Sequence, residues 1–98
     1  MKQNLDLIIT GGNAFLHNEL IEEIDIGILN GKIVELGDLS QRDSKKKLSV
    51  KNLLVLPGAI DSQVHFREPG LTHKEDIMHG TKGAALGGIT TIFEMPNT

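Results

Sequence analysis

Polar side chains that could bind a metal ion or an anion occupy every second position of one short segment. Mainly apolar residues alternate there with Asp61, Gln63, His65 and Arg67. Alternate residues of a β-strand share a face, so these four side chains are predicted to point the same way. An imidazole can bind a metal ion, a guanidinium can hold a carboxylate or phosphate, and a carboxylate can orient the imidazole. The spacing therefore makes His65 a candidate metal ligand, Arg67 a candidate anion partner and Asp61 a candidate orienting residue, with a purely structural histidine as the alternative.

A later segment is predicted to bring one more polar side chain to the same place. A β-branched run covers residues 89–95, and Asn97 follows it after Pro96. Neighbouring parallel strands place their carboxyl ends side by side, so Arg67 and Asn97 are predicted to converge on one anionic ligand. Glu94 lies inside this otherwise apolar run and is predicted to be a buried charge with a partner.

The residues between these two segments have the pattern of a helix. Thr72 and Glu75 have the spacing of a capping box, with Thr72 as the N-cap. Small and apolar residues recur at helical spacing from Ile77 to Ala85, and Gly87–Gly88 is a typical helix stop. A strand over residues 59–66, this helix and the run described above together predict a βαβ unit with parallel strands.

The first 56 residues are predicted to form short β-strands. The β-rich runs cover residues 5–10, 24–28, 32–36 and 53–56. Gly11–Gly12 is predicted to end the first strand in a turn. Asn30–Gly31 is predicted to form a type I′ hairpin turn, in which both residues adopt positive φ. Residues 38–47 are polar and include Lys45–Lys47, which we interpret as part of a solvated loop rather than as a phosphate site.

Composition argues against several classes of function. The 98 residues are 39% hydrophobic and 23% charged, which is typical of a folded domain and not of a disordered segment. The absence of cysteine excludes thiolate zinc sites, disulfides and cysteine nucleophiles within the chain. A net charge of -3 argues against nucleic-acid binding. No apolar run is long enough to span a membrane, and a secretory signal is not expected.

Two stretches of the sequence carry a family resemblance. They are PGAIDSQVHFREPGLTHKEDI (residues 57–77) and GTKGAALGGITTIFEMPNT (residues 80–98). Both closely resemble the N-terminal part of dihydroorotases, in the cyclic amidohydrolase superfamily. The resemblance implies an α/β fold in which residues 57–98 are the first βαβ unit of a metal-dependent (β/α)8 barrel of the TIM type. Residues 1–56 would contribute strands to a small β-sandwich. Allantoinases and dihydropyrimidinases share this layout and are the alternative families.

The resemblance also implies a reaction and the residues that serve it. Dihydroorotases interconvert N-carbamoyl-aspartate and dihydroorotate in pyrimidine biosynthesis, with zinc-bound hydroxide attacking the ring carbonyl. By the motif, His65 would be a zinc ligand, and Arg67 and Asn97 would hold the substrate carboxylate. The implied setting is the cytoplasm, with a small-molecule substrate. A second copy of the chain or another enzyme of the pyrimidine pathway is the implied kind of protein partner.

One position departs from the family pattern. The pattern has His-x-His where this chain has Gln63-Val64-His65, and an amide oxygen is a poor zinc ligand. A single metal ion held by His65 and by ligands elsewhere is compatible with this segment, whereas a binuclear site is not supported. The remaining ligands and the catalytic carboxylate of the pattern would fall beyond Thr98. No catalytic residue is therefore assigned in this segment, and the chain alone is not expected to be active.

Two further hypotheses remain open. A non-catalytic dihydroorotase-like subunit, or a truncated remnant, would act as a scaffold or partner for another enzyme, and Gln63 favours it. A small anion-binding β-module would explain Arg67 but not the βαβ unit.

Overall fold

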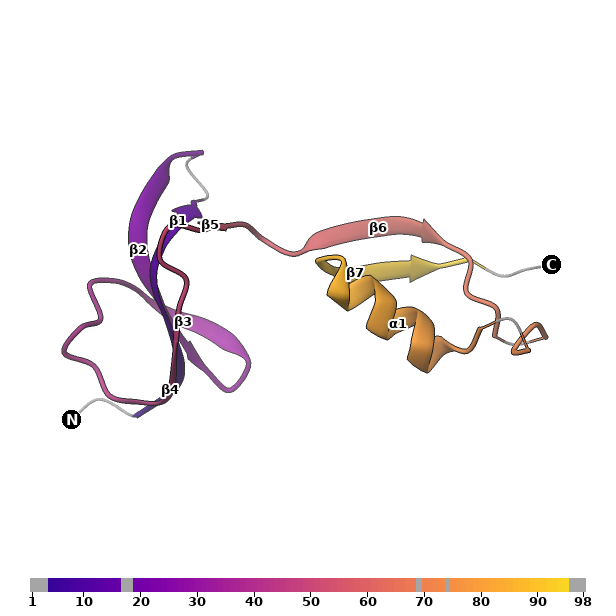
Figure 1. The fold of residues 1–98 in the computed structure, drawn as a ribbon, viewed down its shortest axis with the longest axis horizontal. Helices are drawn as coiled ribbons and strands as arrows, with labels where there is room; N and C mark the ends of the chain where they lie inside the picture. Colours follow the sequence, from indigo (N-terminus) through magenta and orange to yellow (C-terminus); the bar gives the residue numbers. More distant parts are fainter. Residues whose placement is uncertain (1–3, 17–18, 69, 74, 96–98) are drawn as a thin grey trace. The chain divides into compact units, whose positions relative to one another are not determined.

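The computed structural model describes residues 4–16, 19–68, 70–73 and 75–95. They fall into two compact units, Met1–Leu56 and Pro57–Thr98 (Figure 1). Within the described residues, the first unit contains strands only, and the second contains a strand, a helix and another strand. No helix in this described part of the chain is long and apolar enough to cross a membrane.

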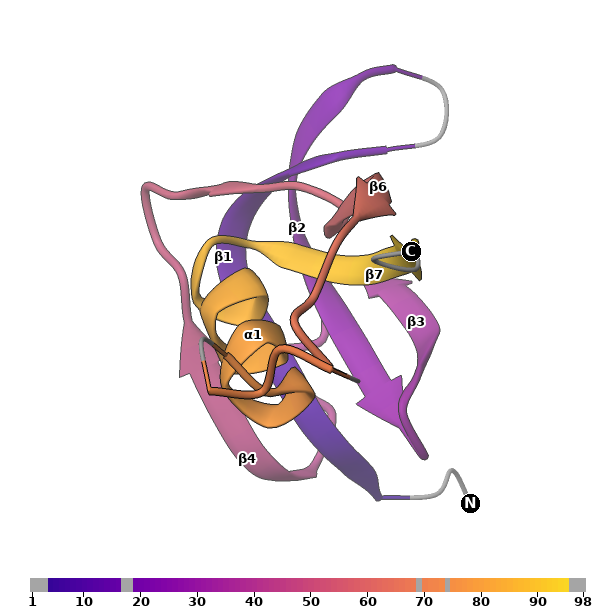
Figure 2. The same cartoon turned by 90° about the vertical axis from the view of Figure 1, so that its right-hand side faces the viewer.

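The first unit is a sheet built around β1 (Leu5–Phe15), with five strands among the described residues. β2 (Ile21–Leu29) pairs antiparallel with β1, and β3 (Lys32–Gly37) pairs antiparallel with β2. On the other edge of β1, β4 (Ser44–Ser49) and the short β5 (Leu54–Val55) both pair parallel with it. β1 and β2 are the long curved ribbons that run side by side in Figure 2. β1 is therefore the central strand, with partners on both edges.

A β-bulge at Thr10 and Gly11 stands in β1 where a turn at Gly11–Gly12 was predicted. Thr10 and Gly11 together lie opposite Asp25 of β2, which leaves one extra residue in β1. Gly11 has a φ of 75°, and its N–H donates to Asp25 Oδ1 at 3.0 Å. A bulge bends a strand without ending it, so β1 continues to Phe15. The prediction that the first strand stops at Thr10 was therefore wrong.

The turn between β2 and β3 confirms the predicted hairpin. Asn30 and Gly31 have φ values of 53° and 75°, as a type I′ turn requires. The Asn30 N–H also donates to Asp6 Oδ2 at 2.8 Å, which connects the turn to β1.

The lysine triplet lies in a strand and not in the solvated loop predicted for it. β4 pairs with β1 in parallel register, from Ser44 opposite Leu5 onward. The lysine side chains are exposed, and Lys45 Nζ lies 3.4 Å from Asp6 Oδ1. Pairing with a strand far earlier in the chain outweighs the local charge pattern here, and lysines on such an edge discourage the addition of a further strand.

The core of the first unit is small and aliphatic. Leu5, Ile8 and Leu39 are buried against one another, and Leu29 packs on them. Asp25 Oδ2 accepts a hydrogen bond from the Leu39 N–H at 2.9 Å. The carboxylate that closes the bulge in β1 therefore also holds the segment after β3 that supplies Leu39 to the core.

The second unit confirms the predicted βαβ arrangement. β6 (Ala59–Val64) and β7 (Ile89–Glu94) form a parallel pair, and α1 (Ile77–Leu86) lies between them in the chain and packs against β7 (Figure 1). β6 ends at Val64, two residues earlier than predicted, so His65 and Phe66 are outside the strand.

The helix begins later than predicted, because two carboxylates set its start. Asp76, and not Thr72, is the N-cap, and its side chain accepts a hydrogen bond from the His79 N–H at 2.8 Å. Glu68 Oε1 accepts from the Ile77 N–H at 3.2 Å. The predicted capping box was therefore wrong, whereas the predicted stop is confirmed, with Gly87 as the C-cap.

Candidate functional site

The carboxyl ends of β6 and β7 lie side by side, as the candidate site requires. Val64 is opposite Glu94, and the Met95 N–H donates to the Val64 carbonyl oxygen at 2.6 Å. The segment that carries His65 and the segment after β7 therefore leave the sheet at the same edge. Asn97 lies outside the described residues, so its convergence with Arg67 stays a prediction.

β6 contains a bulge inside the polar segment. Asp61 and Val64 lie opposite Ile92 and Glu94, so three steps along β6 match two steps along β7. Asp61 Oδ1 accepts a hydrogen bond from the Gln63 N–H at 3.1 Å, which closes a local turn at the bulge. Because the alternation is interrupted there and β6 ends at Val64, the prediction that Asp61, Gln63, His65 and Arg67 share one face of a continuous strand was wrong. Asp61 is half-buried, and the side chain of Gln63 is exposed.

His65 and Arg67 lie at the start of the loop that follows β6, and both side chains are exposed. The residue between them is buried: Phe66 is 6% exposed, and its N–H donates to Glu94 Oε2 at 3.1 Å. The Arg67 carbonyl oxygen accepts a hydrogen bond from the Leu71 N–H at 2.8 Å, which closes a turn immediately after the site. An imidazole and a guanidinium therefore face solvent on either side of one anchored residue.

The anchor of this loop on the helix is the ring of Phe66. A β-carbon at Gly80 of α1 would lie 2.8 Å from two ring carbons, which is closer than carbon atoms pack. Gly80 is itself buried, so the ring fills the space that the missing side chain leaves. Any side chain at the helix position beneath Phe66 would therefore force the ring to shift.

Asp76 and His79 form a hydrogen-bonded pair at the start of α1. Asp76 Oδ1 lies 2.6 Å from His79 Nδ1, in addition to accepting the His79 backbone N–H. The backbone hydrogen bond first, and the contact with the ring second, lower the pKa of Asp76 below its ordinary value of 3.8. Both carboxylate contacts serve the helix terminus, so the pair has a structural role.

The described residues do not by themselves fit a metal site. In this part of the chain, no three side chains of His, Asp or Glu are arranged to hold a metal ion. A zinc site in a protein normally has three or four protein ligands. His65 is exposed at the strand edge, where it could supply one of them. Its role as a ligand therefore depends on residues that the structure does not describe.

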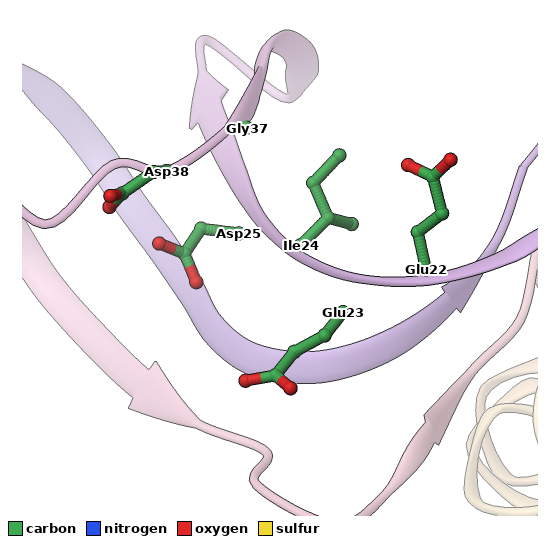
Figure 3. Close-up of a pocket in the computed structure, with 6 residues that line it drawn as sticks. All are labelled: Glu22, Glu23, Ile24, Asp25, Gly37 and Asp38. Carbon is green, nitrogen blue, oxygen red and sulfur yellow. The ribbon is translucent and has the colours of Figure 1, made fainter.

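A second candidate place is an acidic hollow in the first unit. It has a volume of about 500 Å³ and is lined by Glu22, Glu23, Ile24, Asp25, Gly37 and Asp38. Figure 3 shows its carboxylates spread along β2 and the end of β3 and not gathered on one point. Asp25 already accepts two backbone N–H groups. The hollow therefore contributes to the architecture of the sheet and is not assigned a ligand.

Comparison with known proteins places these features in a family. The dihydro-orotase-like family matches residues 52–98, which include β6, α1, β7 and the loop with His65. A dihydroorotase from Methanothermobacter thermautotrophicus is 47% identical over 75 residues, or 76% of this chain. An allantoinase from Salmonella choleraesuis is 44% identical over 93 residues, or 95% of this chain. The chain matches the N-terminal segment of amidohydrolase-family proteins. It spans 17% and 20% of the length of these two relatives.

Solved structures agree with this assignment. An L-hydantoinase (dihydropyrimidinase) from Arthrobacter aurescens has a TM-score of 0.80 and 29% identity, covering 93% of this chain and 20% of that one. A D-aminoacylase with a binuclear metal centre has a TM-score of 0.70 and 27% identity. The match covers 90% of this chain and 18% of the D-aminoacylase chain. The predicted fold class is therefore confirmed for this chain: β-strands of an N-terminal sandwich precede the start of the barrel.

Sequence reasoning missed the contacts that hold the candidate site in place. Glu94 was predicted to be buried and paired, but it is exposed and its partner is the backbone of Phe66. Phe66 was assigned only to the apolar side of a strand. The available signal was an acidic residue at the end of an apolar strand, beside the predicted end of the strand that carries His65.

Proposed function

We propose that this chain is the N-terminal segment of a cyclic amidohydrolase that interconverts N-carbamoyl-aspartate and dihydroorotate. The observation that carries the proposal is the exposed guanidinium of Arg67 beside the exposed imidazole of His65, at the carboxyl edge of a parallel strand pair. Ligand sites in barrels of this type lie at that edge. A guanidinium binds a carboxylate through two parallel hydrogen bonds, and Asn97 is the proposed second partner of the same carboxylate.

The charge of Arg67 favours dihydroorotate over the substrates of the related enzymes. Dihydroorotate carries a carboxylate on its ring, whereas allantoin, hydantoin and unsubstituted dihydropyrimidines carry none. A bound ring that covers the guanidinium of Arg67 without offering it an anionic partner would bind less well, because a charge removed from water needs a partner. Arg67 therefore selects a ring that bears a carboxylate.

We propose zinc as the cofactor of the complete protein. His65 would supply one ligand, and residues outside this chain would supply the others, with Asp61 behind the site. The binuclear metal centre of the similar D-aminoacylase supports a metal requirement in this family. The proposed setting is the cytoplasm. A second copy of the protein, or another enzyme of pyrimidine synthesis, is the proposed class of protein partner.

The test is to measure which ring the complete protein opens, and how Arg67 contributes. We expect hydrolysis of dihydroorotate and not of allantoin or hydantoin. Arg67→Lys keeps the charge but loses the planar fork, so it should weaken dihydroorotate binding by about 1.5–3 kcal/mol. Arg42→Lys is the matched control, because Arg42 pairs with Glu35 in the first unit, at 2.9 Å. Preference for a ring without a carboxylate, or equal binding by Arg67→Lys, would contradict the proposal.

The alternative is a dihydroorotase-like subunit without activity, and Gln63 is the observation that favours it. An amide in place of an imidazole weakens any metal site that includes this position. Under the enzyme hypothesis, Gln63→His should raise the metal content towards two ions per subunit, and elemental analysis measures this directly. A wild-type protein that already binds two ions tightly would show that position 63 does not set the metal content. A wild-type protein that binds no metal and opens no ring would support the subunit.

A further inference from the structure

We propose that Glu94 is a positioning residue that holds the loop after β6 so that His65 and Arg67 point to solvent at the strand edge. The claim that this orientation serves substrate binding rests on the proposed function. The contacts of Glu94 and Phe66 do not depend on it. Glu94 is the last residue of β7 and lies opposite Val64, the last residue of β6.

The first part of the argument is the hydrogen bond between Glu94 and the loop. Glu94 Oε2 accepts the Phe66 N–H at 3.1 Å, across 28 positions of sequence. A carboxylate acceptor makes this bond stronger than one between neutral groups. The Met95 N–H to Val64 carbonyl bond lies just before it, so β7 holds the chain on both sides of His65.

The second part is that Phe66 is also held from the helix side. Its ring packs on Gly80 of α1, and the residue is almost entirely buried. A residue held by its backbone N–H and by its ring has little freedom to rotate. The side chains of its two neighbours, His65 and Arg67, are both exposed. The orientation of these two groups is therefore set by a residue that is not itself part of their chemistry.

The third part concerns what Glu94 contributes chemically. The contact uses a carboxylate oxygen as an acceptor, and a glutamine side chain also offers an acceptor oxygen. A positioning role therefore predicts that glutamine can replace glutamate, whereas alanine cannot. A role in proton transfer would predict that glutamine cannot replace glutamate, because an amide does not titrate.

The experiment compares Glu94→Ala and Glu94→Gln in the complete protein, with Asp76→Ala as the control. Asp76 also bonds a backbone N–H in the same unit, but at the start of α1. For Glu94→Ala we expect faster hydrogen exchange in a peptide covering residues 64–68 and a KM for dihydroorotate raised about tenfold. Glu94→Gln should restore both values. Asp76→Ala should lower the melting temperature without changing either of them.

The outcomes separate this inference from the proposed function. If the wild-type protein opens no ring, the proposed function fails, and the exchange measurement alone decides the role of Glu94. Unchanged exchange at residues 64–68 in Glu94→Ala would overturn the inference. So would an active Glu94→Ala enzyme with a normal KM and only a lower melting temperature. A Glu94→Gln variant as impaired as Glu94→Ala would overturn it as well, because the acceptor oxygen would then not be the part that matters.

Discussion

Two glycines on one helix show how different the demands on the same residue type can be. Gly80 lies under the Phe66 ring, where a β-carbon has no room, whereas a β-carbon at Gly83 would meet no atom within 4 Å. Glycine in a helix lowers stability relative to alanine, because glycine loses more conformational freedom when the chain folds. Gly80 is therefore required by packing, and Gly83 is not required by anything in the described structure.

This difference predicts opposite effects of the same substitution. Gly80→Ala should destabilise the protein by about 1–2 kcal/mol, because overpacking against the ring outweighs the gain in helix propensity. Gly83→Ala should stabilise it by about 0.5–1 kcal/mol. Thermal denaturation of the two variants beside the wild type measures both. Equal effects of the two changes would mean that the ring moves aside without cost.

At the scale of the element, α1 is held at its start by carboxylates that come before it. Asp76 and Glu68 each accept a backbone N–H of the first turn. The pKa of Asp76 is lowered, chiefly by the backbone hydrogen bond from His79. The folded form therefore favours the ionised carboxylate, and the helix start depends on pH.

Stability is expected to fall as the pH is lowered through the pKa of Asp76. The contribution of Asp76 to stability is complete well above pH 3.8 and is lost as the pH falls through the lower pKa of the folded state. Asp76→Asn keeps an N-cap acceptor that cannot titrate. Melting curves of both proteins between about pH 7 and about pH 2.5 should show a smaller acid-dependent loss in the variant. Asp6 and Asp38, whose pKa values are also lowered, titrate in both proteins, so the difference isolates Asp76. Parallel curves would contradict the assignment.

Prediction of the elements from sequence succeeded where local residues decide the structure. Asn30–Gly31 forms the expected hairpin because both residues tolerate positive φ. Gly11–Gly12 has an equally strong local pattern, but Asp25 on the next strand turns it into a bulge. The lysine triplet enters a strand because β1 offers it a partner. Such contacts between distant segments are not visible in a local pattern.

In the candidate site too, the features set by the local motif could be predicted, and those set by contacts with distant segments could not. The identity of His65 and Arg67, and their place at the carboxyl edge of the second unit, could be predicted from the motif. The bulge at residues 62–63 could not, because it depends on the register with β7. Nor could the hydrogen bond that the Phe66 N–H donates to Glu94, which joins the loop after β6 to the end of β7. The place of His65 and Arg67 at the strand edge was therefore predictable, whereas the contacts that support them were not, and their chemistry stays a prediction.

At the scale of the whole molecule, both units leave large apolar side chains exposed. In the second unit, Ile60 is 64% exposed and Phe93 is 55% exposed. Ile60 lies opposite Thr91, two residues before Phe93, so both point to one face of the β6–β7 pair. In the first unit, Ile33, Val34 and Leu36 of β3 are exposed. Exposed apolar side chains of this size promote association in water.

We therefore expect the 98-residue chain, produced by itself, to self-associate or to lack a sharp thermal transition. Light scattering after size-exclusion chromatography, together with thermal denaturation, measures both properties. Replacing Ile60 and Phe93 by threonine, which suits an exposed strand, should reduce the association. A monodisperse wild-type monomer with one cooperative transition would contradict this expectation.

The parallel pairing of β4 and β5 with β1 has a consequence for the order of folding. The two short strands add to β1 one after the other, and β5 ends at Val55, before β6 begins at Ala59. Chains leave the ribosome with the N-terminus first, and compact units fold as they emerge. The β2–β3 hairpin can close, and β2 can pair with β1, as soon as these residues are free, whereas the other edge of β1 has to wait for β4 and β5. When Val55 emerges, all five described strands of this sheet are available, while β6 still lacks its partner β7. Synthesis itself therefore separates the folding of the sheet from that of the segment with His65 and Arg67, and the earlier unit can form without competition from the later one.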